Sequence, residues 1–228
     1  MPQPVSIGVE GDQRISGLLQ APRDARACYV LAHGAGAGMT HPFMAAIAQG
    51  LADRCVATLR YQFPFMERGS RRTDVAEVAH AAVRAAVGEA ARLLPGMALV
   101  AGGKSFGGRM TSQAQAASPL PGVGSLAFLG FPLHPAGRPA DERAKHLAGV
   151  QVRMLFLQGT RDALAEVQLL RSLAERLGER ATLKLFEDAD HSFHVPARTG
   201  RKDADVRSEL LDALAEWIRG VTRRGGAP

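Results

Sequence analysis

Short apolar runs alternate with longer alanine-rich stretches along this chain. The runs that predict strands are rich in β-branched or bulky residues and lie at 14–19, 27–33, 55–60, 97–102, 125–131, 152–159 and 181–187, with a further edge strand at 5–10. Helical periodicity predicts helices near 42–54, 73–93, 107–117, 140–147, 164–178 and 203–220. Runs such as "YVLA" and "MLFL" are apolar on both faces, as strands covered by helices on each side must be. This order predicts an α/β fold with a mostly parallel central sheet and helices on both faces.

The length of the chain fits one domain. At 228 residues it is long enough for a single substantial core, and no linker, internal repeat or low-complexity tract divides it. We therefore expect one domain over residues 1–228, with about residues 1–4 and 222–228 frayed. The connection between the strands at 125–131 and 152–159 has room for a loop and one short helix, so no lid domain is expected there.

The composition is that of an ordinary globular protein, with 46% apolar and 22% charged residues. The first residues lack the basic patch and apolar core of a secretory signal, and no run of about 18 apolar residues is available to span a bilayer. The simplest expectation is a cytoplasmic protein with no membrane partner. Cys28 and Cys55 each lie in an apolar run, so we expect two buried thiols rather than a disulfide or a metal pair.

A net charge of +6 and a pI near 10 raise the question of an anionic partner. The basic residues cluster weakly: Arg68, Arg71 and Arg72 share one loop, and Arg223 and Arg224 lie near the C-terminus. No aromatic residues interleave them to stack bases. A solvated arginine-rich surface is therefore favoured over a nucleic-acid site.

The stretch "AGGKSFGGR", residues 101–109, matches parts of two motifs. Gly103-Lys104-Ser105 resembles the end of a phosphate-binding loop, but the apolar run "MALVA" continues almost to Gly102 and leaves no loop to wrap a phosphate. Gly103-x-Ser105-x-Gly107, in contrast, follows a strand and opens a helix, as the sharp turn that exposes a nucleophilic serine requires. We favour the nucleophile over an ordinary glycine turn with a helix-capping serine.

A nucleophilic serine needs a base and an acid, which on this scaffold follow it on loops after later strands, acid first. Asp162 follows the strand at 152–159, and His191 follows the last strand. Asp188 and Asp190 are the rival candidates for the acid, but they share the loop of the histidine and are favoured as turn residues.

His194 is a second candidate for the base. It lies three residues beyond His191 and just before Val195-Pro196, so His191 is favoured. Asp162 is also a suitable N-cap for the helix expected at 164–178, and a cap need not exclude a catalytic role.

An oxyanion hole requires backbone N–H groups aimed at the developing charge. We expect the N–H of Phe106, directly after the serine, and that of Ala35 in the small-residue loop "HGAGAGM" at 33–39. The same loop lacks a dinucleotide fingerprint, because Met39 or His41 stands where the last glycine should be. We expect neither a metal nor a cofactor.

With these residues in place, the chain resembles the α/β-hydrolases. More narrowly, it is similar to the dienelactone-hydrolase-like branch that includes testis-expressed protein and nonspecific-lethal-complex subunit relatives. The resemblance covers about residues 29–218 and rests on "LAHGAGAGMTHPFM", "RYQFPFMERG", "GGKSFGGRM", "GFPLHPAGRP" and "LFLQGTRD".

The resemblance implies the same nucleophile, acid and base: Ser105, Asp162 and His191. It also implies that the segments 63–66 and 131–135 lie beside the site. Residues from these segments and from the two ends of the glycine-rich loop are the expected substrate-binding residues: His33, Met39, Phe63, Met66, Phe131 and His134. For the apolar members, plain core packing is equally expected.

These observations favour a serine hydrolase that cleaves a small carboxylic ester, thioester or related acyl compound. The second hypothesis is a protein-interaction scaffold that keeps the fold with little turnover, against which the intact set of Ser105, Asp162 and His191 argues. A peptidase has no distinguishing sequence feature. No feature of the sequence names the acyl group or sets an oligomeric state.

Overall fold

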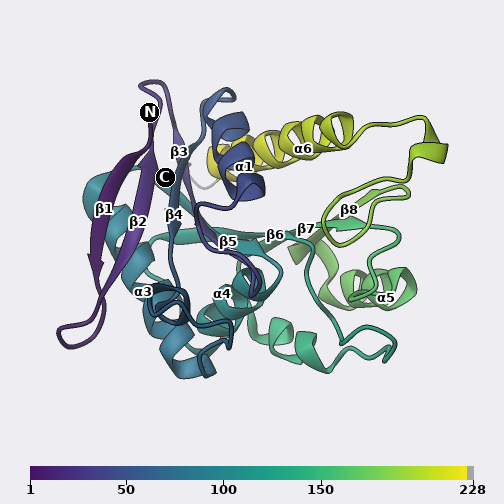
Figure 1. Cartoon of the computed structure of the whole chain (residues 1–228), viewed down its shortest axis with the longest axis horizontal. Coiled ribbons are helices and arrows are strands. Elements are labelled where there is room, and N and C mark those ends of the chain that lie inside the picture. The colour runs from purple at the N-terminus through teal and green to yellow at the C-terminus, as the bar shows by residue number, and fades with distance from the viewer. Residues whose placement is uncertain (225–228) are drawn as a thin grey trace.

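The computed structural model describes residues 1–224. Its strands form one sheet in the order β1-β2-β4-β3-β5-β6-β7-β8 (Figure 1). The strands are β1 Gln3–Gly8, β2 Arg14–Gln20, β3 Ala27–Ala32, β4 Ala57–Tyr61, β5 Ala98–Lys104, β6 Val123–Leu129, β7 Arg153–Gly159 and β8 Ala181–Phe186. The pairs β1·β2 and β2·β4 are antiparallel, and every later pair of neighbours is parallel. The mostly parallel sheet expected from the alternating pattern is confirmed.

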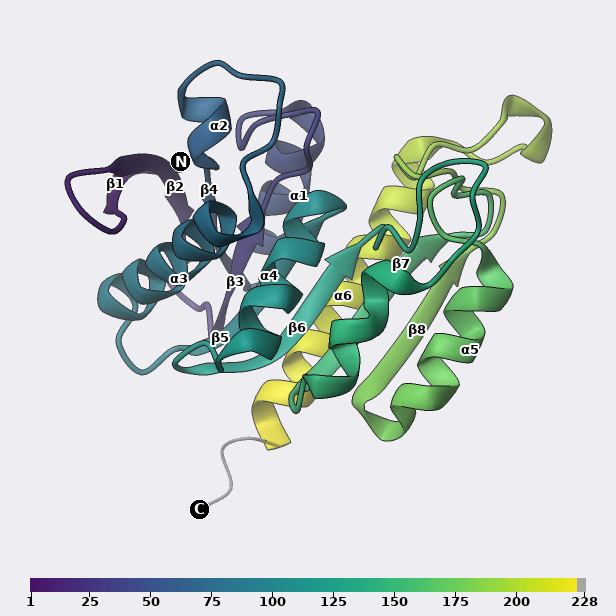
Figure 2. The same cartoon turned by 90° about the horizontal axis from the view of Figure 1, so that it is seen from below.

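Helices cover both faces of the sheet. The α-helices are α1 Pro42–Ala52, α2 Pro64–Glu67, α3 Ala76–Leu93, α4 Phe106–Ala117, α5 Val167–Leu177 and α6 Asp203–Arg224, and the 3-10 helices are η1 Glu142–Gly149, η2 Gly178–Arg180 and η3 Ala197–Thr199. Figure 2 shows α3, α4 and α5 in front of the sheet and α6 behind it. Two apolar cores result, one between the sheet and α3 and the other between the sheet and helices α1 and α6. Because β3 and β4 lie between these cores, every one of their residues is buried.

The parallel register brings the carboxyl ends of the central strands to the same edge. Ala32 pairs with Gly103, Leu129 with Leu157, and Gly159 with Phe186. The loops that follow these strands therefore meet at that edge, which is where open α/β sheets place their sites.

Some residues near the two ends that were expected to be frayed lie in regular secondary structure. Gln3 and Pro4 belong to β1, where they pair with Leu19 and Leu18 across the ladder. Residues 222–224 continue α6 instead of fraying, because that helix runs on to Arg224. The rest of the expected tail, residues 225–228, lies outside the described residues.

The expectation of two buried thiols is wrong for Cys55. Cys28 is buried in β3, whereas Cys55 is exposed and has φ of 60° in the turn between α1 and β4. Its thiol lies 2.7 Å from a carboxylate oxygen of Asp24. The apolar run that predicted a strand from residue 55 forms one only from Ala57, because the chain must first reverse direction after α1.

The connection between β6 and β7 contains η1, a single short helix as its length predicted. No helix within residues 1–224 combines the length and the apolar character needed to cross a membrane.

Candidate active site

Ser105 occupies the sharp turn between β5 and α4. Its backbone has φ of 50° and ψ of −115°, a conformation that costs free energy for a residue with a side chain and that clusters at functional sites. The turn is held by the Ser105 N–H, which donates to the carbonyl of Leu129 at 3.1 Å, and by the Arg109 N–H, which donates back to the Ser105 carbonyl.

Two glycines on either side of Ser105 allow the backbone of this turn to lie close to the backbone at the end of β3. A Cβ atom at Gly103 would lie 2.2 Å from the carbonyl oxygen of Ala32, and one at Gly107 would lie 2.5 Å from that of His33. Both distances are far inside van der Waals contact. The two glycines of the Gly-x-Ser-x-Gly pattern are therefore required by packing against the end of β3.

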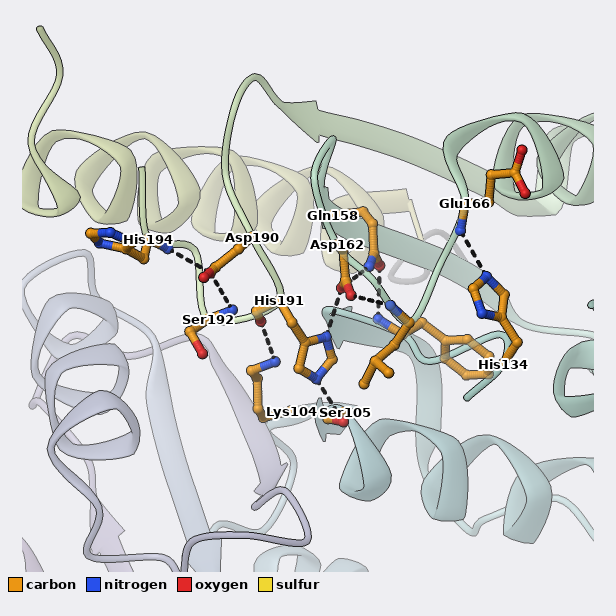
Figure 3. A network of polar contacts seen from close by, with 12 residues as sticks. Lys104, Ser105, His134, Gln158, Asp162, Glu166, Asp190, His191, Ser192 and His194 are labelled. Carbon is orange, nitrogen blue, oxygen red and sulfur yellow. Dashed lines mark hydrogen bonds and ion pairs between the residues drawn. The ribbon is translucent and has the colours of Figure 1, made fainter. Parts of the chain in front are cut away.

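A continuous chain of hydrogen bonds joins Ser105 to two residues from later loops (Figure 3). The Ser105 Oγ lies 2.9 Å from Nε2 of His191, and Nδ1 of His191 lies 2.6 Å from Oδ2 of Asp162. The Asp162 side chain is fully buried, whereas that of His191 is 25% exposed. A buried carboxylate on Nδ1 fixes the tautomer in which Nε2 can accept the serine proton.

Asp162 is held in place by two further donors. Gln158 of β7 donates its side-chain amide to Oδ2, and the backbone N–H of Leu164 donates to Oδ1 at 2.8 Å. Together with His191, these donors satisfy the hydrogen-bonding capacity of the buried carboxylate. Asp162 is not the N-cap of the following helix, because α5 begins only at Val167 with Glu166 as its cap.

The loop that carries His191 is shaped by Asp190. The Asp190 carboxylate accepts the backbone N–H groups of Ser192 and His194 at 2.7 and 3.0 Å, so it is engaged within the loop. Asp188 has φ of 58° in the turn after β8, and its N–H donates to Thr160. These contacts agree with the interpretation of Asp188 and Asp190 as turn residues.

His194 does not join this chain of hydrogen bonds. Its ring pairs with Asp203, the first residue of α6, at 2.8 Å from Nδ1 to Oδ2, which raises the pKa of His194 and lowers that of Asp203. His194 and Asp203 both line the mouth of the same cavity as Ser105.

A cavity of about 480 Å³ lies against Ser105 and His191. Its other walls come from the loop 34–37, from the start of α1 at Phe43 and Met44, and from Lys104. Ala35, the expected second oxyanion donor, is part of this wall. Phe106 is the first residue of α4, so its N–H has no acceptor within the helix.

The glycine-rich loop is held in place by residues of β4 and of the segment directly after it. Gln62 accepts the Met39 N–H at 2.8 Å, and Arg60 of β4 donates to the Met39 carbonyl at 3.1 Å. His33 Nε2 accepts the Phe63 N–H at 2.9 Å, and its Nδ1 lies 2.7 Å from the Gly34 carbonyl. This pairing makes His33 a neutral ring protonated on Nδ1, and burial lowers its pKa accordingly.

The expected substrate-binding residues require correction. Within the described chain, none of the six lines the cavity beside Ser105. Phe63 and Phe131 are fully buried and pack in the core on the α3 side, as the core-packing interpretation expected. His33 is fully buried as well, and its ring nitrogen Nε2 is occupied by the hydrogen bond from the Phe63 N–H.

The remaining three residues also have structural contacts. His134 is buried, and its Nε2 accepts the N–H of Glu166, which ties the loop after β6 to the loop after β7. Met66 is half-buried against the core of the α3 side. Met39 is half-buried and contributes its backbone to the contacts with Gln62 and Arg60.

Sequence reasoning missed several residues that support the site. Gln158 is an amide inside the otherwise apolar run "RMLFLQG", and its Oε1 accepts the Phe131 N–H at 2.8 Å. Arg60 is a cation in a strand buried at every residue. Both residues could have been found from the sequence, because each is a polar residue in a strand that is buried on both faces. A buried polar side chain must have a hydrogen-bond partner.

The described residues contain no group of three or more His, Cys, Asp or Glu side chains placed to hold a metal ion.

The sequence matches the family described as alpha/beta hydrolase domain over residues 25–219. The chain belongs to this family. Solved structures with the same fold cover nearly the whole α/β-hydrolase chain at low sequence identity. A dienelactone hydrolase from Anabaena variabilis has a TM-score of 0.77 at 20% identity, covering 96% of this chain and 98% of that one.

Two further structures are similar to this α/β-hydrolase. The esterase domain of a Rhodothermus marinus protein has a TM-score of 0.73 at 17% identity, covering 96% of this chain and 98% of that one. A serine hydrolase without lid from Xanthomonas campestris has a TM-score of 0.72 at 20% identity, covering 95% and 94%. Like that protein, the present α/β-hydrolase has no lid domain in the described connection between β6 and β7, which holds the short helix η1.

Proposed function

We propose that this protein is a serine hydrolase that cleaves a carboxylic ester, thioester or related acyl compound through an acyl-enzyme on Ser105. The observation that carries the proposal is the unbroken chain of hydrogen bonds from Asp162 through His191 to Ser105, at the wall of an accessible cavity. A serine hydroxyl becomes a useful nucleophile when a positioned base takes its proton.

In the proposed reaction, Ser105 Oγ attacks the acyl carbon while His191 Nε2 takes the hydroxyl proton. The imidazolium keeps its Nδ1–H bond to Asp162, and the N–H groups of Phe106 and Ala35 stabilise the oxyanion. His191 then gives the proton to the leaving group. A water molecule, activated by the same ring, releases the acid and restores Ser105.

The cavity supports a small substrate. Its volume of about 480 Å³ lies within the range of small-molecule sites, and no lid domain of the described chain covers it. We propose a small or accessible acyl group and no cofactor, in a cytoplasmic protein. Placement in the dienelactone-hydrolase-like branch, with testis-expressed and nonspecific-lethal-complex relatives, is part of the proposal and rests on the motifs around Ser105 and Asp162.

A fluorophosphonate probe tests the proposal directly. It should label Ser105 alone among the serines, with the adduct on the peptide that contains residues 105–109. Labelling should vanish in Ser105→Ala and fall sharply in His191→Ala. His194→Ala is the matched control and should still be labelled, because its ring pairs with Asp203 and not with the serine.

The competing hypothesis, a protein-interaction scaffold without turnover, predicts a different result. A folded protein whose Ser105 reacts with no probe, and that leaves p-nitrophenyl esters, thioesters and lactones intact, would contradict the proposal. An adduct on another serine would contradict it as well.

A further inference from the structure

Lys104, the residue before the nucleophile, reaches across the site to the loop of the base. Its Nζ donates a hydrogen bond to the backbone carbonyl of His191 at 2.6 Å (Figure 3). The next residue, Ser105, contacts the ring of the same histidine. Two consecutive residues at the end of β5 therefore hold His191 by its backbone and by its side chain.

The surroundings of Lys104 are built for an ammonium group. The Nζ lies 5.8 Å from the centre of the Phe193 ring, within range of a cation–π interaction. Gly130 leaves the necessary room, since a Cβ atom there would lie 2.9 Å from Nζ and 3.4 Å from the His191 ring. The negative charges of Asp162 and Asp190 attract the group.

The loop of the base needs an anchor on this side. Asp188 and Phe193, on either side of His191, both have positive φ, a conformation that side chains disfavour. The contacts made by Asp190 stay within the loop, and the Arg161 N–H that donates to Ala189 ties the loop to the β7 side. Asp203 of α6, which accepts the Val195 N–H and pairs with His194, holds the far end of the loop. The Lys104 bond and the Ser105 bond together connect the loop to the nucleophile turn.

We propose that Lys104 is a positioning residue that fastens the His191 loop to the nucleophile turn, so that Nε2 stays within hydrogen-bond distance of Ser105 Oγ during proton transfer. This inference rests on the proposed function. It gives the lysine of "GGKSFGG" a role in the reaction that is unrelated to binding phosphate.

The protonation state of Lys104 gives the inference a pH signature. Burial lowers the pKa of Lys104 to about 8, although the carboxylates of Asp162 and Asp190 oppose the shift. Below that pH the ammonium makes a charge-assisted bond to the carbonyl, and above it the neutral amine makes a weaker one. The other titratable groups around the cavity are His41, His191, His194 and Asp203.

The test compares Lys104→Met with Lys104→Arg and with the control Lys184→Met. Methionine matches the lysine side chain as far as Cε and removes the donor Nζ. Arginine keeps a charge at all accessible pH values, and Lys184 is an exposed lysine of β8. The fluorophosphonate labelling rate is measured from pH 6 to 10, together with kcat and KM for a p-nitrophenyl ester. Thermal unfolding identifies variants that do not fold.

Lys104→Met should slow labelling by about tenfold to a hundredfold and lower kcat while KM changes little, because a buried charged hydrogen bond is lost. Wild type should lose labelling rate as the pH rises through about 8. That loss should be absent in Lys104→Met and Lys104→Arg, and Lys184→Met should behave as wild type. Amide exchange in residues 190–195 should also be faster in Lys104→Met.

The outcomes separate this inference from the proposed function. A wild-type protein that is never labelled contradicts the proposed function and removes the reaction in which Lys104 would take part. A wild-type protein that is labelled at a rate that does not fall through pH 8 contradicts the pH signature. If Lys104→Met fails to fold, amides of residues 190–195 that exchange without protection in the wild type overturn the inference. Equal labelling rates and equal exchange in folded Lys104→Met overturn it too.

Discussion

The carboxylate of Asp162 lies 2.6 Å from Nδ1 of His191, although 29 positions separate the two residues in the sequence. Asp190, the neighbour of His191 in the chain, has its carboxylate on backbone N–H groups of its own loop instead. Distance along the sequence is thus a poor guide to which carboxylate meets the ring.

This difference predicts unequal effects of matched substitutions. Asp162→Asn should leave the protein folded and lower ester turnover by about four orders of magnitude, because an amide cannot hold the histidine tautomer. Asp190→Asn should cost less than about tenfold, since its amide oxygen can still accept the same backbone groups. Steady-state kinetics on both folded variants provide the measurement, and the reverse ranking would move the acid to Asp190.

The buried amide of Gln158 predicts a combined effect on stability and turnover. Gln158→Met removes the donor to Asp162 and the acceptor of the Phe131 N–H, leaving both buried groups without that partner. We expect the free energy of unfolding to fall by about 1–3 kcal/mol and kcat/KM to fall by about tenfold. Gln151→Met, at an exposed position, is the control, and denaturant titration gives the stability. Loss of stability with unchanged kcat/KM would limit Gln158 to a structural role.

Gln62 is predicted to support the glycine-rich loop that carries Ala35, the proposed oxyanion donor. Gln62→Leu removes the acceptor for the Met39 N–H and should allow the loop 34–39 to move, so that kcat falls by about tenfold or more while KM changes less. Gln3→Leu, an exposed change in the edge strand, should have no such effect. Unaltered kcat in a folded Gln62→Leu protein would show that the other fastenings of the loop suffice.

The close approach at Gly107 predicts opposite outcomes for two glycine-to-alanine changes. Gly107→Ala places a Cβ atom 2.5 Å from the His33 carbonyl oxygen, so we expect a loss of several kcal/mol or no folded protein. Gly88→Ala adds a Cβ atom with no neighbour within 4 Å in the middle of α3 and should stabilise by about 0.5–1 kcal/mol. Thermal unfolding of both variants decides, and a stable Gly107→Ala protein would contradict the packing argument.

The sequence by itself determined the order of the strands and of the longer helices, but it did not predict the short helices α2, η2 and η3. Apolar runs that fit buried strands and alanine-rich periodic stretches fixed the alternation, because burial on both faces permits few residue types. The motif around Ser105 and the order of Asp162 and His191 were also readable locally, since each lies in the segment that follows a strand. The same local reasoning was wrong for Cys55, and it did not predict that Gln3 and Pro4 pair in β1 or that α6 continues through residues 222–224.

Only the tertiary structure decided which side chains surround the site. Phe63 and Phe131 belong to segments that the family resemblance placed beside the site, yet their burial in the core removes them from the cavity wall. Phe43 and Met44 reach that wall from the start of α1, and Asp203 reaches it from α6, although none of the three was expected to bind substrate. The physical reason is that a cavity forms where loops from several strands converge, and their convergence depends on sheet order and register, which local periodicity does not contain.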